Sequence, residues 1–196
     1  MKIFTLKCDY NNIRLNNSRS NKSIREEDEV MKNIVLIGMP GCGKSAIGQI
    51  LSEKLRMTFL DIDAYIEEST NHTITEIFKN GEEGFRDIEA MATLRLSESD
   101  SVVISTGGGV IIRYENILNL KKNGIIFYIN RPIKNIAGDI YIEARPLLSK
   151  DVSQLYRLFK ERGPLYKKYC HHEIMNISNI DYVVNNIIEI YEKINS

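Results

Sequence analysis

The stretch Gly38-Met39-Pro40-Gly41-Cys42-Gly43-Lys44-Ser45 decides the fold of this chain. It fits the pattern G-x-x-x-x-G-K-[ST] and follows the apolar run at 33–37, so a buried strand leads through a glycine loop into a helix. Glycines let backbone N–H groups turn inward around a polyphosphate, and the positive end of the helix dipole points at the same anion. We therefore predict a phosphate-binding loop. The alternative is a plain glycine turn between a strand and a helix.

The residue types in this loop predict how each would bind a nucleotide and its metal ion. Lys44 is expected to reach the β and γ phosphates of a nucleotide, and the Ser45 hydroxyl to ligate Mg²⁺. The predicted ATP-binding residues are Gly41, Cys42, Gly43, Lys44, Ser45 and Ala46.

Length and composition limit what the loop can serve. The chain has 196 residues, 43% of them hydrophobic, which is enough for one α/β domain with a core. Lys plus Arg and Asp plus Glu both number 26, so no net field attracts nucleic acid or an anionic membrane.

The cysteines and the apolar runs indicate the compartment. Cys8, Cys42 and Cys170 form no C-x-x-C pair, which argues against a disulfide framework and a zinc site. We read the histidines at 72, 171 and 172 as surface or loop residues. No run is long enough to span a bilayer, and the first residues lack the apolar core of a signal peptide. We expect a cytoplasmic monomer.

Residues 1–30 differ in composition from the rest of the chain. They are rich in asparagine and hold few large apolar side chains after Leu15, which predicts a disordered tail. Alternatively, translation begins at Met31 and the tail is an artefact of an upstream start, or Lys2–Lys7 adds a short strand. The folded domain is expected at 31–196.

Strand and helix patterns alternate through that domain. Strands are predicted at 33–37, 58–60, 101–105, 124–130 and 173–177. Helical spacing follows the phosphate loop at Ile47, Ile50, Leu51 and Leu55, and again over 180–194. This alternation predicts a three-layer, doubly wound, five-stranded parallel sheet.

Two carboxylates and a glycine run follow predicted strands. Asp61 and Asp63 lie two apart, so on a strand both would face one side at the edge where ligands bind. They suit Mg²⁺ binding and proton acceptance, and a solvated turn or a helix cap at Asp63 is the alternative. The run Thr106 to Gly109 allows a ligand to approach the backbone closely, or is only a flexible turn.

Three arginines are candidates for binding anions. Arg86 lies among apolar neighbours and suits a carboxylate, although spacing alone favours a surface salt bridge to Glu82 or Glu83. Residues 136–150 show little apolar periodicity and read as an unstructured lid, in which Arg145 either covers the nucleotide or is a solvated cation. Arg162 stands where the next helix meets Gly163-Pro164, a predicted break.

Taken together, these motifs resemble the shikimate kinases, within the nucleoside-monophosphate-kinase-like group of phosphate-loop folds. The resemblance covers about 31–194. It rests on the ordered series GMPGCGKS, then DID at 61–63, IE at 66–67, ITEIF at 74–78, GEEGFRDIE at 81–89, TGGG at 106–109, RPLL at 145–148 and RGPLY at 162–166.

The resemblance implies phosphorylation of the 3-hydroxyl of shikimate by ATP with Mg²⁺. It implies that Asp63 orients or deprotonates that hydroxyl, and that Asp61 contributes to the Mg²⁺ environment through water. Arg86 and Arg162 would bind the carboxylate. The backbone of Gly107, Gly108 and Gly109 would bind the ring hydroxyls, and Arg145 the ATP phosphates. The substrate-binding region would lie at about 61–95 and the lid at about 136–150.

Two positions depart from the family pattern. Asn71 stands where glycine is common, and asparagine tolerates positive φ, so the turn is expected to survive. Gly138 stands where some relatives carry a second lid arginine, which predicts weaker nucleotide binding or lid closure. The alternative functions are a kinase for another small hydroxy acid such as gluconate, and a nucleotide-driven switch, although the guanine motif N-K-x-D is absent.

Overall fold

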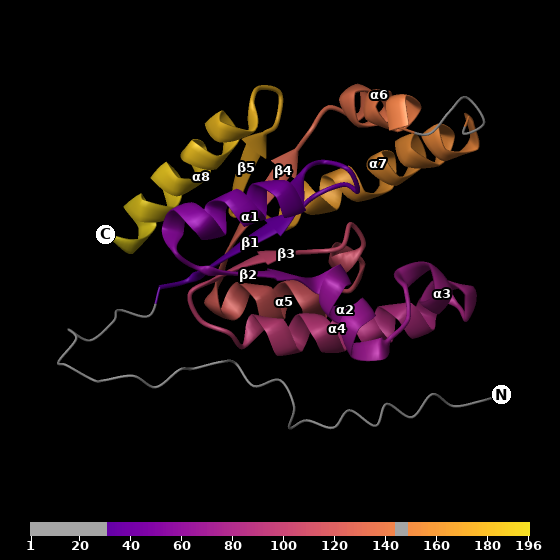
Figure 1. Cartoon of the computed structure of the whole chain (residues 1–196), viewed down its shortest axis with the longest axis horizontal. Helices are drawn as coiled ribbons and strands as arrows, with labels where there is room; N and C mark the ends of the chain where they lie inside the picture. The colour runs from indigo at the N-terminus through magenta and orange to yellow at the C-terminus, as the bar shows by residue number, and fades with distance from the viewer. Residues whose placement is uncertain (1–30, 144–148) are drawn as a thin grey trace. The chain divides into compact units, whose positions relative to one another are not determined.

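A five-stranded parallel sheet organises the part of the chain that the computed structural model describes, residues 31–143 and 149–196 (Figure 1). The strands lie in the order β2-β3-β1-β4-β5, and every neighbouring pair is parallel. They are β1 (Asn33–Ile37), β2 (Thr58–Asp61), β3 (Val102–Ser105), β4 (Gly124–Asn130) and β5 (His172–Met175). The predicted fold class is confirmed. The predictions for residues 1–30 and for Arg145 lie outside the described residues.

Helices cover both faces of the sheet. α1 and α8 pack together on one face, and α4 and α5 on the other (Figure 1), as right-handed crossovers between parallel strands require. The helices are α1 (Lys44–Leu55), α2 (Ile62–Thr70), α3 (Ile74–Lys79), α4 (Glu82–Ser97), the short 3₁₀ helix η1 (Val110–Ile112), α5 (Tyr114–Asn123), α6 (Ile133–Glu143), α7 (Ser149–Tyr169) and α8 (Ile180–Asn195). No helix in the described part of the chain is both long and apolar enough to cross a bilayer.

The central strand fixes the position of the phosphate loop. Every residue of β1 is buried, and it is hydrogen-bonded on both sides, to β3 and β4. Covered on both faces, such a strand needs a continuous apolar run, which its sequence supplies. Because all five strands are parallel, the segments that follow them emerge at one edge of the sheet. The phosphate loop, Asp61 and the glycine run therefore meet there.

The prediction that the lid at about 136–150 is unstructured is wrong for its first half. Residues 133–143 form helix α6, and α7 already begins at Ser149. α6 contacts α7 and buries Ile136 and Ala137. With so few buried positions, the apolar residues of α6 show no clear helical periodicity in the sequence.

The predicted break at Gly163-Pro164 is also wrong. α7 continues through Pro164 to Tyr169. Proline removes one helical hydrogen bond, but its fixed φ is close to the helical value. Tyr166, about one helical turn beyond Arg162, is fully buried. Its packing holds the last turns of α7 in place. Arg162 therefore projects from a continuous helix.

The last strand is shifted from its predicted bounds. β5 begins at His172, which is partly exposed, and Ile177 lies beyond the strand with 64% of its surface exposed. His171 precedes the strand, and its Nδ1 accepts a hydrogen bond from the N–H of Ile126 at 2.8 Å. The ring thereby extends the pairing of β5 with β4.

Candidate active site

The phosphate loop between β1 and α1 has the backbone shape that its glycines predict. Gly41 and Gly43 have φ values of 75° and 98°, in the left-handed region that side chains with a Cβ seldom enter. Gly43 is the N-cap residue of α1. The unpaired amides of the first helical turn therefore face the loop, where they can bind an anion.

Lys44 lies folded over this loop. Its Nζ donates to the carbonyl oxygens of Gly38 at 3.0 Å and Met39 at 2.9 Å, and the residue is buried. Beneath it, Cys42 is fully buried, and the Cys42 carbonyl accepts a hydrogen bond from Asn176 Nδ2 at 2.9 Å. The ammonium charge is thus held at the loop, and the segment after β5 supports the loop from behind.

A group of oxygen atoms lies beside the loop. Ser45 Oγ donates to Asp61 Oδ2 at 2.8 Å and lies 3.3 Å from Ser105 Oγ. These oxygens come from α1 and from the carboxyl ends of β2 and β3. A hydroxyl and a carboxylate this close are the hard ligands that Mg²⁺ prefers. The residues present therefore fit the predicted metal.

The two carboxylates of the D-I-D motif occupy different surroundings. β2 ends at Asp61 and α2 begins at Ile62, so the prediction that both carboxylates project from one strand is wrong. Asp61 is the helix cap, because its Oδ1 accepts from the N–H groups of Asp63 and Ala64. Asp63, in the first turn of α2, lines a cavity instead. Burial, and next the negative charge of Asp61, raises the pKa of Asp63.

The three consecutive glycines after β3 each make room for a different neighbour. A Cβ on Gly107 would lie 2.7 Å from Asp63 Oδ1, and one on Gly108 would lie 2.6 Å from Pro40 Cδ of the phosphate loop. A Cβ on Gly109 would overlap the guanidinium of Arg86. The run is therefore the point where Asp63, the phosphate loop and Arg86 meet, and any side chain there would separate them.

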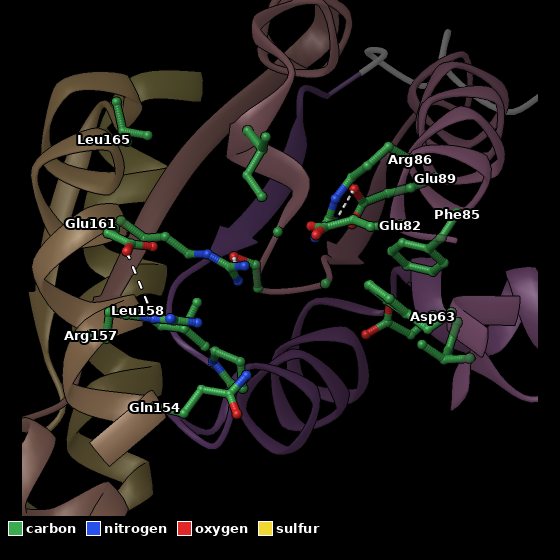
Figure 2. Close-up of a pocket in the computed structure, with 18 residues that line it drawn as sticks. Asp63, Glu82, Phe85, Arg86, Glu89, Gln154, Arg157, Leu158, Glu161 and Leu165 are labelled. Atoms are coloured by element: carbon green, nitrogen blue, oxygen red, sulfur yellow. Dashed lines mark hydrogen bonds and ion pairs between the residues drawn. The ribbon is translucent and has the colours of Figure 1, made fainter. Parts of the chain in front are cut away.

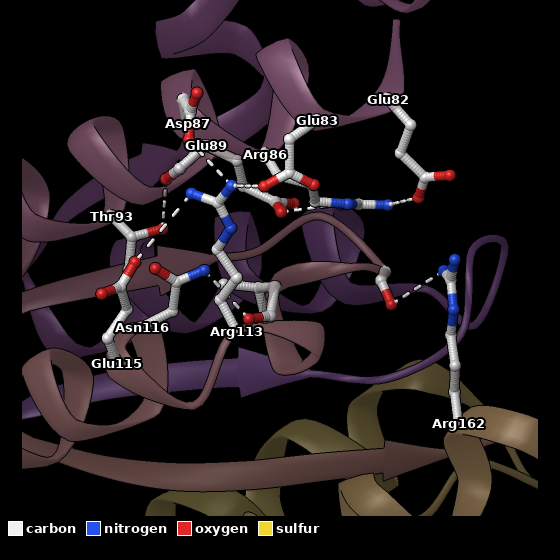
Figure 3. A network of polar contacts seen from close by, with 12 residues as sticks. Glu82, Glu83, Arg86, Asp87, Glu89, Thr93, Arg113, Glu115, Asn116 and Arg162 are labelled. Carbon is white, nitrogen blue, oxygen red and sulfur yellow. Dashed lines mark hydrogen bonds and ion pairs between the residues drawn. The ribbon is translucent and has the colours of Figure 1, made fainter.

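Arg86 is a buried cation in a carboxylate network. Its Nη1 donates to Glu89 Oε2 at 2.7 Å and its Nη2 to Glu82 Oε1 at 3.0 Å (Figure 3). Its Cζ lies 5.1 Å from the centre of the Phe85 ring, and its Nε is buried without a hydrogen-bond partner. Burial raises the pKa of Glu89, although the Arg86 charge opposes this. The salt bridge to Glu82 exists, but the arginine is not the surface residue that spacing favoured.

A second arginine, which the sequence did not single out, fixes the helix that carries this network. Arg113, just after η1, pairs with Asp87 at 2.7 Å and also with Glu83, both on α4 (Figure 3). The contact ties α4 to the segment that follows the glycine run. Its sequence signal was weak, since one arginine between two apolar segments is common.

One face of α7 forms the opposite wall. Arg162 Nη1 donates to the Gly108 carbonyl at 3.1 Å. Further residues of this wall recur at helical spacing of three or four, the signal by which they could have been found: Gln154, Arg157, Leu158, Glu161 and Leu165. Sequence reasoning chose Arg162 alone from this face.

These walls enclose a cavity of about 640 Å³ (Figure 2). Figure 2 shows Asp63, Phe85, Arg86 and Glu89 on one side and residues of α7 on the other. The structure brings all six predicted substrate-binding residues to this cavity, namely Asp63, Arg86, Gly107, Gly108, Gly109 and Arg162. Pro40 joins it to the phosphate loop, while Gly41 to Ala46 continue that loop into α1.

The turn at Asn71, between α2 and α3, has the predicted conformation. Asn71 ends α2 with φ of 55°, in the left-handed region. Asparagine enters that region more readily than other residues with a Cβ. The departure from glycine leaves the backbone turn intact.

A phosphate-binding loop beside a cavity lined by arginines and a carboxylate defines a class of protein: a phosphate-loop kinase that acts on a small anionic acceptor. The shikimate kinase family model matches residues 40–192. A shikimate kinase of Clostridium botulinum is 47% identical over 161 residues, which cover 82% of this chain and 98% of the relative. This chain belongs to the shikimate kinase family.

Solved structures agree with this assignment. A shikimate kinase of Acinetobacter baumannii in complex with shikimate has a TM-score of 0.77 and 34% identity, covering 83% of this chain and 94% of that one. A gluconokinase of Sinorhizobium meliloti has a TM-score of 0.57 and 14% identity, over 83% of this chain and 93% of that one. The second likeness shows the fold alone.

Proposed function

We propose that this protein transfers the γ-phosphoryl group of ATP to the 3-hydroxyl of shikimate and releases ADP and shikimate 3-phosphate. The observation that carries the proposal is the glycine run, which places Asp63, Arg86 and Pro40 of the phosphate loop around one point. An acceptor held in the cavity thereby lies next to the loop that binds the donor. Family membership supports the same reaction.

The cavity suits a small acid that carries hydroxyl groups. Arg86 and Arg162 face the cavity from opposite walls, and paired guanidinium groups match the geometry of a carboxylate. Arg86 lines the cavity, so its guanidinium can donate to that carboxylate. Backbone groups of Gly107 to Gly109 and the Asp63 carboxylate can pair with ring hydroxyls. A bound shikimate would therefore have a partner for each of its polar groups.

The transfer step follows from the same groups. Asp63 accepts the proton of the 3-hydroxyl, and the hydroxyl oxygen forms a bond to the γ-phosphorus. The bond from that phosphorus to the β,γ-bridging oxygen breaks, and ADP leaves with the electron pair. The raised pKa of Asp63 makes it a stronger base than an exposed aspartate.

The donor side uses the phosphate loop. Lys44, the loop amides and the N-terminus of α1 bind the β and γ phosphates. Ser45, with Asp61 through water, would hold Mg²⁺, which supplies charge neutralisation on the transferring phosphoryl group when bound. In the same proposal Arg145 binds the ATP phosphates from the lid at about 136–150. We also propose that the active protein is a monomer.

An ADP-release assay with ATP and different acceptors tests this function. Shikimate should support turnover at least 100-fold above the rate without acceptor, whereas gluconate and nucleoside monophosphates should not. Phosphorus NMR of the product should show one phosphomonoester on the 3-oxygen. Faster turnover with gluconate would replace shikimate by that acid. Equal ADP release with and without every acceptor would favour a nucleotide switch.

A further inference from the structure

The Gly108 carbonyl oxygen accepts two hydrogen bonds from α7. Arg162 Nη1 donates to it at 3.1 Å, and the Tyr166 hydroxyl at 2.5 Å. The two side chains lie four residues apart and therefore project from the same face of the helix. Two donors of different character, one a cation that faces the cavity and one a buried hydroxyl, share a single acceptor in the middle of the glycine run.

Tyr166 is fixed much more firmly than Arg162. Tyr166 is fully buried, and its ring stacks on that of Tyr128 with centres 5.2 Å apart. Burial raises the pKa of Tyr166 well above its usual value, so the hydroxyl remains a hydrogen-bond donor throughout the working pH range. Arg162, by contrast, lines the cavity. If one of the two donors moves when a ligand enters, it is the arginine.

The shared acceptor is also the residue that joins the two ligand sites. Gly108 approaches Pro40 of the phosphate loop so closely that a Cβ would lie 2.6 Å from the proline ring. Its carbonyl must hold its direction for the neighbouring N–H groups to keep theirs. A carbonyl that loses its partners when ligand excludes water from the cavity carries a desolvation penalty.

We propose that Tyr166 is a positioning residue for the substrate: it keeps the Gly108 carbonyl hydrogen-bonded while Arg162 turns from that carbonyl to the substrate carboxylate. This inference rests on the proposed function, because shikimate supplies the carboxylate. In this structure Arg162 Nη1 donates to the carbonyl. When shikimate binds, Arg162 leaves the neutral Gly108 carbonyl and donates to the charged carboxylate. The Tyr166 hydroxyl then keeps the Gly108 carbonyl hydrogen-bonded.

The variant Tyr166→Phe tests the proposal, since it removes the hydroxyl and keeps the ring that stacks on Tyr128. We expect kcat/KM for shikimate to fall about tenfold, the usual effect of leaving one hydrogen-bonding group unpaired. The loss should appear in KM for shikimate, with kcat within threefold of wild type and KM for ATP unchanged. Unchanged kcat/KM for shikimate, or an equal rise in both KM values, would overturn the proposal.

Tyr191→Phe is a matched control. Tyr191 is also buried, and its hydroxyl also donates to a backbone carbonyl, that of Lys32, away from the cavity. This variant should lower thermal stability about as much as Tyr166→Phe does, and it should leave KM for shikimate unchanged. An equal KM change in both variants would indicate a general loss of stability instead of a role at the site.

A double-mutant cycle with Arg162→Ala separates positioning from a purely structural role. Without Arg162 there is no exchange of partners, and the shortened side chain leaves room for a water on the Gly108 carbonyl, so Tyr166→Phe should lower kcat/KM for shikimate by less than twofold in that background. The value of kcat/KM can be measured at low shikimate concentration even in a variant that shikimate cannot saturate. The same tenfold loss in both backgrounds would contradict the proposal.

A structure of the wild-type protein with shikimate decides the matter even if Tyr166→Phe does not fold. We expect Arg162 on the carboxylate and the Tyr166 hydroxyl still on the Gly108 carbonyl. An Arg162 that stays on the carbonyl, or a released Tyr166 hydroxyl, would overturn the proposal. Wild-type protein that does not phosphorylate shikimate would instead refute the proposed function, so the two failures are distinct.

Discussion

At the scale of single residues, the surroundings of Asp63 shift its pKa in opposing directions. Burial raises its pKa, as do the charges of Asp61 and Glu67, whereas Lys44 and Arg86 lower it. Such surroundings destabilise the charged form of the carboxylate, so it accepts a proton more readily than an exposed aspartate does. Reactivity and stability are therefore expected to change in opposite directions when it is replaced.

Asp63→Asn should lower kcat at least ~100-fold, the usual contribution of a positioned general base. The amide keeps the size of the side chain but cannot accept the proton of the hydroxyl. Steady-state kinetics with saturating shikimate and ATP measure the effect. Asp181→Asn is the control, because Asp181 is an exposed aspartate in the first turn of α8. A kcat near the wild-type value would remove Asp63 from the chemistry.

The raised pKa of Asp63 predicts two pH effects. The kcat/KM for shikimate should fall as pH drops through this pKa, which lies above the ordinary 3.8. Because the pKa is raised on folding, the carboxyl stabilises the fold while protonated, and this contribution is lost as pH rises through the folded pKa. Asp63→Asn should therefore unfold at the same or a higher temperature than wild type at pH 7.5. Calorimetry should show the difference narrowing toward pH 5, and a less stable variant at pH 7.5 would contradict the sign.

At the scale of elements, Arg131 links α6 to the phosphate loop. Arg131, which follows β4 directly, donates from Nη1 to the Gly41 carbonyl at 3.1 Å and pairs with Asp139 of α6 at 2.6 Å. Ile136 of the same helix lies 3.0 Å from the position of a Cβ on Gly41. The start of the predicted lid thus packs directly on the loop that binds phosphate.

Arg131→Ala should raise KM for ATP several-fold and leave KM for shikimate within twofold. The contact supports the loop but lies outside the acceptor cavity. Initial rates with each substrate varied in turn measure the split. Arg95→Ala is the control, because Arg95 forms only an exposed pair with Glu98, which contributes about 0–1 kcal/mol. Equal changes in both KM values would mean that the contact supports the fold as a whole.

At the scale of the whole molecule, the described elements supply both ligand sites and the core. The family match begins at residue 40, and the first strand begins at Asn33. Just before that strand, the Met31 backbone is hydrogen-bonded to the Ser101 hydroxyl, and the Lys32 carbonyl accepts from the Tyr191 hydroxyl. The described sheet, cavity lining and phosphate loop all lie after Met31 in the chain.

A chain that begins at Met31 should keep kcat and both KM values within twofold of the full-length protein. Its midpoint of thermal unfolding should lie within about 2 °C, because the core and the sheet that the structure describes are kept in the shorter chain. Kinetics and calorimetry on the two proteins make the comparison. A large loss on truncation would show that residues 1–30 contribute to the fold or to a site.

The sequence alone determined the features whose signal is local. The phosphate loop has a fixed pattern of glycines, a lysine and a serine because backbone shape and charge demand those residues within one turn. The buried strands read as apolar runs, and β4 was predicted with its observed bounds. The resemblance of the ordered motifs also reversed the surface assignment that spacing favoured for Arg86.

Only the tertiary structure decided what depends on residues far apart in the chain. Helix α6 needs two buried residues and a neighbour on α7, and α7 continues through Pro164 because packing outweighs the lost hydrogen bond. The pairing of Arg86 with Glu89, and of Arg162 and Tyr166 with the Gly108 carbonyl, follows from how α4 and α7 pack. Local sequence cannot specify such contacts, because they form only when the sheet brings its strand ends to one edge.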